Sequence, residues 1–495
     1  MKQKNKLLLL VLISGMSVFA QNRQMNLDQY FSDLAKNREF NGSVLAAEKG
    51  EIIYKKSFGY ADFKNKIKNT DSTLINLASV SKTLTAIAVL QLKEQGKLKL
   101  DDVFVKYIPE FPYPGITVKQ LLSHTSGLPD NEELLDSIIA LNPDKILTNR
   151  DIIPALINYK KNKELKFKPG ERWGYSTTGY ELLAMLVEKI SKQPFGIYMK
   201  QHVFIPAGMT HSYVQTSLSQ KTDRDRCINY MYSNHYEMKL QQMDTLPDWK
   251  EFTYNSTGLI GGSNVVSSIN DLLAYDNALY SGKILKPETL QEAFVPVKLN
   301  NGKDNKAVVG SYGLGWFIEK DSTGGITVSH SGSAPGVTTF FIRDLNKKQV
   351  LIIIQNIQNP SFNISPVLQM MNGGSVIYKK SVAFEFARCL YQNGMEPALS
   401  RLREMLSDTV QYVLTERDMA RVGLEFSRTH FQQYSLEAYK LNTEFFPKSW
   451  KAYDDYASIL LKRKQKDEAI KMYQKSIELN PDNLNGKKAL EQILK

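Results

Sequence analysis

Ser79-Val80-Ser81-Lys82 places a hydroxyl and an amine three residues apart, a spacing that puts both side chains on one face of a helix. A serine is a weak nucleophile until a base takes its proton, and a lysine amine in an apolar site can be that base. The start of a helix also offers free backbone N–H groups where an oxyanion could form. The motif therefore indicates covalent serine catalysis, although Ser79 could instead cap the helix while Lys82 reaches solvent.

Two further segments carry side chains suited to the same chemistry. Tyr175 lies in a polar loop within Trp173–Tyr180, and His330-Ser331-Gly332-Ser333 ends a predicted strand. The six histidines form no HxH or HExxH pattern with carboxylates at ligand spacing. We therefore expect no metal site and no cofactor.

Strand patterns occur at two places far apart in the chain. Ser43–Ala47 and Ile52–Lys56 flank a turn that contains Gly50, which predicts a β-hairpin. Leu351–Ile354 is apolar at every position, as in a central strand covered on both faces. Short connections predict antiparallel pairing for four later segments, which are Tyr312–Glu319, Ile326–His330, Thr338–Asp344 and Gln349–Ile357. We expect the hairpin and this strand group to share one sheet.

Helical patterns separate the two strand groups. Leu74–Gln95 predicts a mostly buried helix, and Glu181–Ile190 predicts another, preceded by a loop over Glu171–Tyr180. Residues 101–300 alternate such patterns with loops rich in Gly, Pro and Asn. The expected fold class of residues 21–375 is α+β, an antiparallel sheet flanked by helices with an inserted helical lobe.

These motifs, in this order, resemble serine β-lactamases of class C and the related D-alanyl-D-alanine carboxypeptidases and esterases. The resemblance runs from about Met25 to Asn356 and implies a β-lactamase/transpeptidase-like fold. Besides the three segments above, the matching motifs are Leu121–Leu128, Gly261–Ser263 leading to a helix with Asp271, and Tyr312–Trp316. Because these motifs occur together, the interpretation of Ser79 as only a helix cap is the weaker one.

The resemblance implies a role for each matching residue. Ser79 would be the acyl-accepting nucleophile, Lys82 would activate it, and Tyr175 would work with Lys82 to pass a proton to the leaving group. The backbone N–H groups of Ser79 and Ser333 would form the oxyanion hole. His124 lies in a loop that is structural in the family, so we do not expect it to be catalytic.

Two residues depart from the family pattern. Thr177 stands where the pattern is Y-x-N, and that asparagine usually binds the acyl-side amide of the substrate. His330 stands where many β-lactamases carry the lysine of K-T-G, and a neutral histidine recognises a carboxylate less strongly than lysine does. Both departures favour acyl transfer with poor β-lactam turnover. The residues expected to contact substrate are Thr177, His330, Ser331 and Gly332, of which Ser331 could bind a carboxylate.

Beyond Asn372-Gly373-Gly374 the chain is helical throughout and contains an internal repeat. Positions 34 residues apart match in four pairs, which are Gly423 with Ala457, Leu436 with Ile470, Tyr439 with Tyr473 and Pro447 with Pro481. This period resembles tetratricopeptide repeats, and Trp450–Asn483 is the better copy. Residues 376–495 thus predict an all-α, tetratricopeptide-like region in which residues 416–483 could bind a protein partner. A generic helical bundle is the alternative.

Residues 1–20 predict a secretory signal peptide, with three lysines before an apolar run and Val18-Phe19-Ala20 as a cleavage site. The run is too short to span a bilayer. We therefore expect an exported protein, periplasmic or secreted, with no stable membrane span once the signal is removed. Losing the three lysines lowers the formal charge from +12 to +9, and the remaining charges are scattered, so no nucleic-acid partner is expected.

The composition is that of an ordinary globular protein. With 495 residues, 42% of them hydrophobic, the chain is long enough for two to four structural units and is neither collagen-like nor wholly disordered. Its two cysteines, Cys227 and Cys389, are expected to stay unpaired, because a disulfide between them would have to cross a domain boundary.

Three functions remain open on the sequence alone. The first is a secreted serine hydrolase that works through an acyl-enzyme on amide or ester bonds of D-Ala peptides or small esters. The second is a β-lactamase that hydrolyses β-lactam antibiotics. The third is a weak or inert hydrolase domain that serves as an interaction protein through its helical repeats. The intact set of Ser79, Lys82 and Tyr175 argues against an inert domain.

Overall fold

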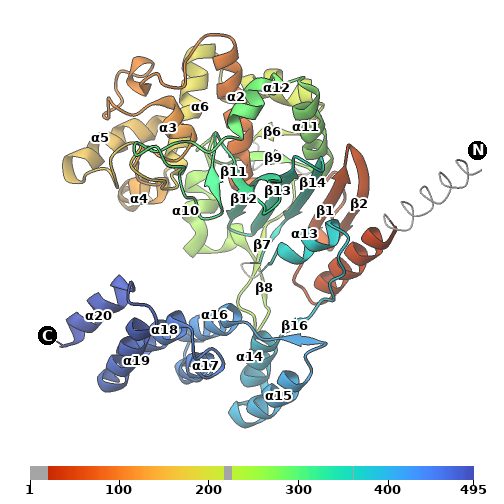
Figure 1. Cartoon of the computed structure of the whole chain (residues 1–495), viewed down its shortest axis with the longest axis vertical. Coiled ribbons are helices and arrows are strands. Elements are labelled where there is room, and N and C mark those ends of the chain that lie inside the picture. The colour runs from red at the N-terminus through yellow and green to blue at the C-terminus, as the bar shows by residue number, and fades with distance from the viewer. Residues whose placement is uncertain (1–20, 217–225, 360–361, 495) are drawn as a thin grey trace, which may run out of the picture. The chain divides into compact units, whose positions relative to one another are not determined.

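The structure is a computed structural model that describes residues 21–216, 226–359 and 362–494. The described chain divides into two compact units (Figure 1). The first contains the described residues up to Met231 and those of Gln241–Val376, and the second contains Tyr232–Leu240 and the described part of Ile377–Lys495. The sequence did not predict that a short internal segment would group with the C-terminal helices.

The first unit is built on one seven-stranded antiparallel sheet. Its order is β10-β11-β12-β13-β14-β1-β2, so the N-terminal hairpin and the later strands share one sheet, as predicted. In the register, Leu45 lies opposite Ile352. The strands are β1 (Gly42–Glu48), β2 (Glu51–Phe58), β10 (Ser311–Tyr312), β11 (Phe317–Lys320), β12 (Ile326–Ala334), β13 (Val337–Asp344) and β14 (Gln349–Gln355).

Hydrophobic patterning explains the centre of this sheet. All seven residues of β14 are buried, which confirms the prediction of a central strand covered on both faces. The hairpin turn uses Gly50 at φ +84°, a conformation that glycine adopts without steric penalty. The predicted α+β class is therefore correct for this unit.

Helices flank the sheet and form an inserted lobe. In Figure 1 the helices α3, α4 and α5 lie together beyond the β11 side of the sheet, whereas β1 and β2 form the opposite edge. The main helices are α2 (Ser81–Glu94), α3 (Val118–Leu122), α4 (Asn131–Leu141), α5 (Ile152–Asn162), α6 (Thr177–Ser191), α7 (Phe195–Met199), α11 (Ile269–Ser281), α12 (Pro287–Ala293) and α13 (Ser365–Met371). Every residue of α2 from Ser81 to Leu92 is buried, as the sequence predicted for this helix.

Two predicted element boundaries were wrong. The segment predicted as helix from Leu74 begins instead as a short strand, β5 (Ile75–Asn76), followed by the 3-10 turn η1 (Ala78–Val80). The loop predicted to run to Tyr180 ends earlier, because α6 begins at Thr177. The Thr177 N–H donates to a carboxylate oxygen of Asp130 at 2.7 Å, a helix-stabilising contact from a distant part of the chain that local pattern cannot reveal.

Three small sheets complete the described part of the first unit. One is the antiparallel pair of β3 (Tyr60–Asp62) and β4 (Ile67–Lys68). The other two have the orders β5-β9-β6 and β15-β7-β8, in which β7 and β15 run parallel. Their strands are β6 (Tyr213–Val214), β7 (Tyr230–Tyr232), β8 (Leu240–Gln242), β9 (Val265–Ser267) and β15 (Ile357–Gln358). The range Tyr232–Leu240, from the last residue of β7 to the first residue of β8, belongs to the second unit.

The second unit is almost entirely helical, which confirms the predicted all-α region. Its helices are α14 (Val382–Asn393), α15 (Met395–Ser407), α16 (Glu416–Ser427), α17 (Gln432–Phe445), α18 (Trp450–Lys462), α19 (Lys466–Leu479) and α20 (Leu484–Leu494). A Cβ on Gly423 would lie 2.8 Å from the Tyr439 ring, so α16 and α17 touch at this position. The equivalent Ala457 and Tyr473 lie in one buried apolar cluster, so α18 and α19 repeat the arrangement.

Two sequence expectations concern membranes and thiols. The predicted signal peptide, residues 1–20, lies outside the described residues. Among the helices of the described chain, none combines the length and hydropathy that a bilayer span requires. Cys227 and Cys389 are both free thiols, as predicted, and they belong to different units.

Candidate active site

The hydroxyl of Ser79 and the amine of Lys82 are brought together at the start of α2. Ser79 is the middle residue of η1, and Lys82 is the second residue of α2. Lys82 Nζ donates to Ser79 Oγ at 3.0 Å and to the carbonyl oxygen of Gly262 at 2.7 Å. The Lys82 residue has no solvent-exposed surface. The pair therefore has the distance that proton transfer between nucleophile and base requires.

The backbone just before Ser79 is strained and is held by an asparagine pair. Ala78 has φ +46°, a left-handed conformation that costs a non-glycine residue about 1–3 kcal/mol. Its N–H donates to Asn76 Oδ1 at 2.7 Å, and Asn76 Nδ2 donates to Asn264 Oδ1 at 2.9 Å. These two bonds fix the turn that presents Ser79. Strain of this kind, at the residue before a nucleophile, is typical of preorganised sites.

Tyr175 presents its ring, rather than its hydroxyl, to the amine. Lys82 Nζ lies 4.9 Å from the centre of the Tyr175 ring and 5.7 Å from that of Tyr180. Within the described residues, the Tyr175 hydroxyl makes no hydrogen bond to Ser79 or to Lys82. The three predicted catalytic side chains thus converge, while a proton relay through Tyr175 would need its hydroxyl to turn toward the amine.

The His124 ring packs against the Tyr175 ring. The two rings stack with centres 4.2 Å apart and an interplanar angle of 29°. His124 Nδ1 accepts the Ser176 N–H at 3.1 Å, so a neutral His124 carries its proton on Nε2. Burial, reinforced by the nearby charge of Lys82, lowers the pKa of His124 well below its usual value. A buried neutral ring in this position matches the structural role expected for His124.

The end of β12 packs against the segment that carries the nucleophile Ser79. β11 pairs with β12 only as far as Ser329, so residues 330–334 leave one backbone edge without a strand partner in the described chain. A Cβ on Gly332 would lie 2.4 Å from the Leu77 carbonyl oxygen and 3.0 Å from the Ser79 nitrogen. Only glycine allows this close approach. Ser333 is exposed beside this position, with its side chain on the same side of the strand as Ser331.

His330 is buried and forms two hydrogen bonds within the protein. His330 is 1% exposed, and its Nδ1–H donates to the Ser331 carbonyl oxygen at 2.7 Å. Its Nε2 therefore accepts the Tyr312 hydroxyl at 3.0 Å in the neutral ring. Burial, aided by the charge of Lys82, lowers the pKa of His330 to about 3. Both ring nitrogens of His330 are thus hydrogen-bonded within the protein, and its contact with substrate stays a prediction.

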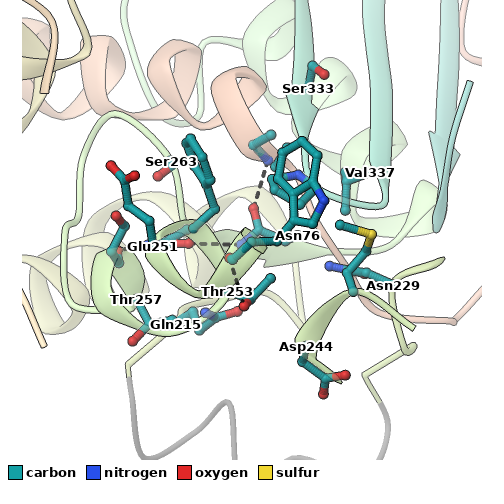
Figure 2. Close-up of a pocket in the computed structure, with 18 of the residues that line it drawn as sticks. Asn76, Gln215, Asn229, Asp244, Glu251, Thr253, Thr257, Ser263, Ser333 and Val337 are labelled. Atoms are coloured by element: carbon teal, nitrogen blue, oxygen red, sulfur yellow. Dashed lines mark hydrogen bonds between the residues drawn. The ribbon is translucent and has the colours of Figure 1, made fainter. Parts of the chain in front are cut away.

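A cavity of about 430 Å³ opens onto Ser79. Thr177 and Ser333 line it beside the nucleophile, whereas Lys82, Tyr175 and His330 are not among its lining residues. In Figure 2, Ser333 and Val337 lie on one side of the pocket, and Glu251 and Thr257 on the opposite side. Further lining residues are Asn229, Met243, Asp244, Trp249 and Phe252. The cavity can hold a substrate considerably larger than the bond that Ser79 would attack.

Comparison with known proteins decides the family. Residues 27–366 match the family described as Beta-lactamase. The chain belongs to the beta-lactamase family. Penicillin-binding protein 4* of Bacillus subtilis is 36% identical over 339 residues, which are 68% of this chain and 72% of that protein. Protein flp of Staphylococcus aureus is 28% identical over 336 residues, 66% of this chain and 61% of that one.

Solved structures show the same beta-lactamase-family fold. A penicillin-binding protein from Bacillus halodurans superposes with a TM-score of 0.57 at 23% identity, covering 69% of this chain and 97% of that one. A D-amino acid amidase from Ochrobactrum anthropi SV3 gives a TM-score of 0.54 at 22% identity, covering 79% and 99%. With the family match, the chain is a serine hydrolase of the beta-lactamase and penicillin-binding-protein type.

Several residues of this beta-lactamase-family site carried no signal in the sequence. Asn76 and Asn264 lie 188 residues apart and have no motif. Tyr180, whose hydroxyl donates to the Leu122 carbonyl oxygen at 2.6 Å, was noted only as the end of the segment Trp173–Tyr180. Tyr312 was noted only as part of a family motif. In the described residues, no cluster of three or more His, Cys, Asp or Glu side chains could hold a metal ion.

Proposed function

We propose that this chain hydrolyses amide or ester bonds through an acyl-enzyme formed on Ser79. The observation that carries the proposal is the 3.0 Å contact between Lys82 Nζ and Ser79 Oγ in a site where Lys82 is fully buried. Across this contact the serine proton would pass from Oγ to Nζ as Oγ bonds to the substrate carbonyl carbon.

The proton then moves to the leaving group. Tyr175, whose ring lies against Lys82, would pass the proton from Nζ to the departing nitrogen or oxygen as the scissile bond breaks. Water then attacks the acyl-Ser79 ester, its proton returns to Ser79 Oγ through the same groups, and the free acid leaves. The sum is hydrolysis of one bond by one water, with the enzyme unchanged.

The oxyanion of both steps would lie between two backbone N–H groups. Those of Ser79 and Ser333 are the candidates, because Gly332 packs β12 directly against the Ser79 nitrogen. Donors fixed by a helix start and a strand edge need no rearrangement when the charge develops. Ser331, exposed at the same edge, would bind a substrate carboxylate.

Peptides that end in D-alanine and small esters are the proposed substrates, acted on outside the cytoplasm. The support is the 36% identity with a penicillin-binding protein and a cavity large enough for a peptide acyl group. Efficient hydrolysis of β-lactams is less well supported, because Thr177 lines the cavity where the family pattern has asparagine. Residues 1–20 would supply the export signal.

Partner binding by the helical unit is a second candidate function. The repeated contact of Gly423 with Tyr439, and of Ala457 near Tyr473, favours a tetratricopeptide-like stack over an irregular bundle. A protein partner at residues 416–483 would be compatible with catalysis by the first unit.

A panel of substrates tests the proposal. Purified mature protein and Ser79→Ala would be compared on D-Ala-D-Ala peptides, p-nitrophenyl esters and a chromogenic cephalosporin. We expect turnover of peptide or ester by the wild type, weak cephalosporin turnover, and loss of all three in Ser79→Ala. Turnover that persists in Ser79→Ala, or a wild type inactive on the whole panel, would overturn it. Proteins of the natural cell envelope that stay bound to Ser79→Ala in a pull-down would support the second candidate.

A further inference from the structure

Glu181 is a buried carboxyl group that reaches the wall of the catalytic cavity through Asn131. It lies about one helical turn after Thr177 on α6 and is 1% exposed. Its Oε1 accepts an Nδ2–H of Asn131 at 2.9 Å, and Asn131 and Thr177 both line the cavity that opens onto Ser79. We propose that Glu181 is a positioning residue for the reaction, because it fixes the Asn131 amide on the cavity wall beside Thr177. This inference rests on the proposed acyl-enzyme function.

The backbone of Asn131 is fastened to the start of α6 by a neighbouring carboxylate. Asp130 Oδ1 accepts the Thr177 N–H at 2.7 Å and the Asn131 N–H at 2.9 Å. These bonds hold the first residue of α4 next to the first residue of α6. The Asn131 backbone is thus fixed without Glu181, and the bond to Glu181 is left to fix the direction of the amide side chain.

The Asn131 amide keeps one group for a substrate. Its Oδ1 accepts the Glu132 N–H at 2.9 Å, and one of its two Nδ2–H groups is used by Glu181. The second Nδ2–H makes no hydrogen bond to any residue that the structure describes. Because Asn131 lines the cavity, this N–H is a donor for a substrate carbonyl on the side of Thr177. Without Glu181 the amide can rotate, and the donor loses its fixed position.

Burial keeps the Glu181 carboxyl group uncharged at neutral pH. Desolvation raises the pKa of Glu181 to about 8, and the negative charge of Asp130 adds to this rise. The hydrogen bond from Asn131 and the charge of Lys82 act in the opposite direction. Oε2 is also buried and has no hydrogen-bond partner in the described chain. Glu181→Gln therefore imitates the uncharged group and keeps the acceptor Oε1, whereas Glu181→Ala removes the hold on Asn131.

A double-mutant cycle in the full-length chain tests the inference. Glu181→Ala, Asn131→Ala and the double variant would be compared on an N-acylated D-Ala-D-Ala peptide, which has an acyl-side amide, and on p-nitrophenyl acetate, which has none. We expect the ratio of kcat/KM on peptide to kcat/KM on acetate to fall about fivefold in each single variant, mainly through KM of the peptide. The double variant should fall no further than Asn131→Ala, because Glu181 acts through Asn131. Glu288→Ala, which removes an exposed carboxylate on α12, is the control and should keep the wild-type ratio.

A conservative variant and a binding measurement separate positioning from folding and from turnover. Glu181→Gln should bring the ratio back to within about twofold of wild type. In calorimetry, the Kd of the unreacted peptide for Ser79→Ala should rise about fivefold when Glu181→Ala is added. Falls that multiply in the double variant, an equal loss on peptide and acetate, or no rescue by Glu181→Gln would overturn the inference. A wild type that hydrolyses neither substrate would instead defeat the proposed function. The calorimetry would still decide the inference, since an unchanged Kd would overturn it.

Discussion

The Tyr312 hydroxyl lies 3.0 Å from Nε2 of His330, and this bond turns the histidine inward from the strand edge beside Ser79. Burial raises the pKa of Tyr312 well above its usual value, so its hydroxyl keeps the proton that it donates. The histidine in turn donates from Nδ1 to the carbonyl of Ser331. His330 therefore braces the strand that carries Ser331 and Ser333 through both of its ring nitrogens.

This bracing predicts that acid destabilises the fold through His330. Its pKa falls from 6.5 to about 3 on folding, so the stabilisation is complete above pH 6.5 and is lost as pH falls toward 3. At pH 5 the loss would be about 2 kcal/mol. Urea unfolding of wild type, His330→Gln and the exposed control His211→Gln at pH 7 and pH 5 measures it. If wild type and His330→Gln lose the same free energy of unfolding between pH 7 and pH 5, the prediction is wrong.

Removing the proposed base should abolish catalysis without unfolding the chain. Lys82→Met keeps a flexible apolar stem and deletes the amine that donates to Ser79 Oγ. A lost general base typically lowers the rate 10²–10⁴-fold, so we expect kcat on a p-nitrophenyl ester to fall by about 10³-fold. Lys93→Met, on the same helix but paired with Glu292, should retain nearly full activity. Less than a tenfold fall for Lys82→Met would show that another group takes the serine proton.

Thr177→Asn should improve substrates that carry an acyl-side amide. Thr177 lines the cavity beside Ser79, and an asparagine amide would add one hydrogen bond that the threonine hydroxyl cannot reach. A hydrogen bond of about 1–1.4 kcal/mol corresponds to a five- to tenfold gain in kcat/KM. We expect this gain for a D-Ala-D-Ala peptide or a cephalosporin and none for p-nitrophenyl acetate, which has no such amide. Equal kinetics of the variant and wild type on all three would exclude contact between this position and the acyl side.

The close approach of β12 to the nucleophile predicts that Gly332 tolerates no side chain. A Cβ there would lie 2.3 Å from Thr339 Oγ1 and 2.4 Å from the Leu77 carbonyl oxygen, so Gly332→Ala must displace the strand or the turn before Ser79. Overpacking of this kind destabilises by about 1–3 kcal/mol, and a displacement near 1 Å lowers activity about 10²-fold. Thermal unfolding and ester kinetics would be compared with Gly115→Ala, where the added methyl meets open space. Wild-type activity in Gly332→Ala would show that the two segments do not act together.

Local spacing sufficed to predict the central pair and the main sheet. Ser79 and Lys82 lie three residues apart, so a helical backbone alone brings them together. The apolar run Leu351–Ile354 marked the central strand because a strand covered on both faces must be apolar throughout. Contacts between residues close in the chain, and the burial of one or both faces of a helix or strand, produce such patterns in the sequence.

Long-range contacts explain what the sequence did not predict. The left-handed Ala78 depends on Asn76, which is itself held by the distant Asn264. The hydrogen bond between His330 and the buried hydroxyl of Tyr312 leaves no signal in the local sequence around either residue. The excursion Tyr232–Leu240 reads as an ordinary loop, since its partners lie on helices 150 or more residues later. None of these contacts alters a local pattern.

Covalent labelling of the nucleophile tests the central claim most directly. Wild type, Ser79→Ala and the exposed control Ser72→Ala would be treated with a fluorophosphonate and with a fluorescent penicillin, and the labelled peptide would be mapped by mass spectrometry. We expect one label per chain on Ser79 in wild type and Ser72→Ala, and no label in Ser79→Ala. A label on any other residue, or labelling that persists in Ser79→Ala, would contradict an acyl-enzyme on Ser79.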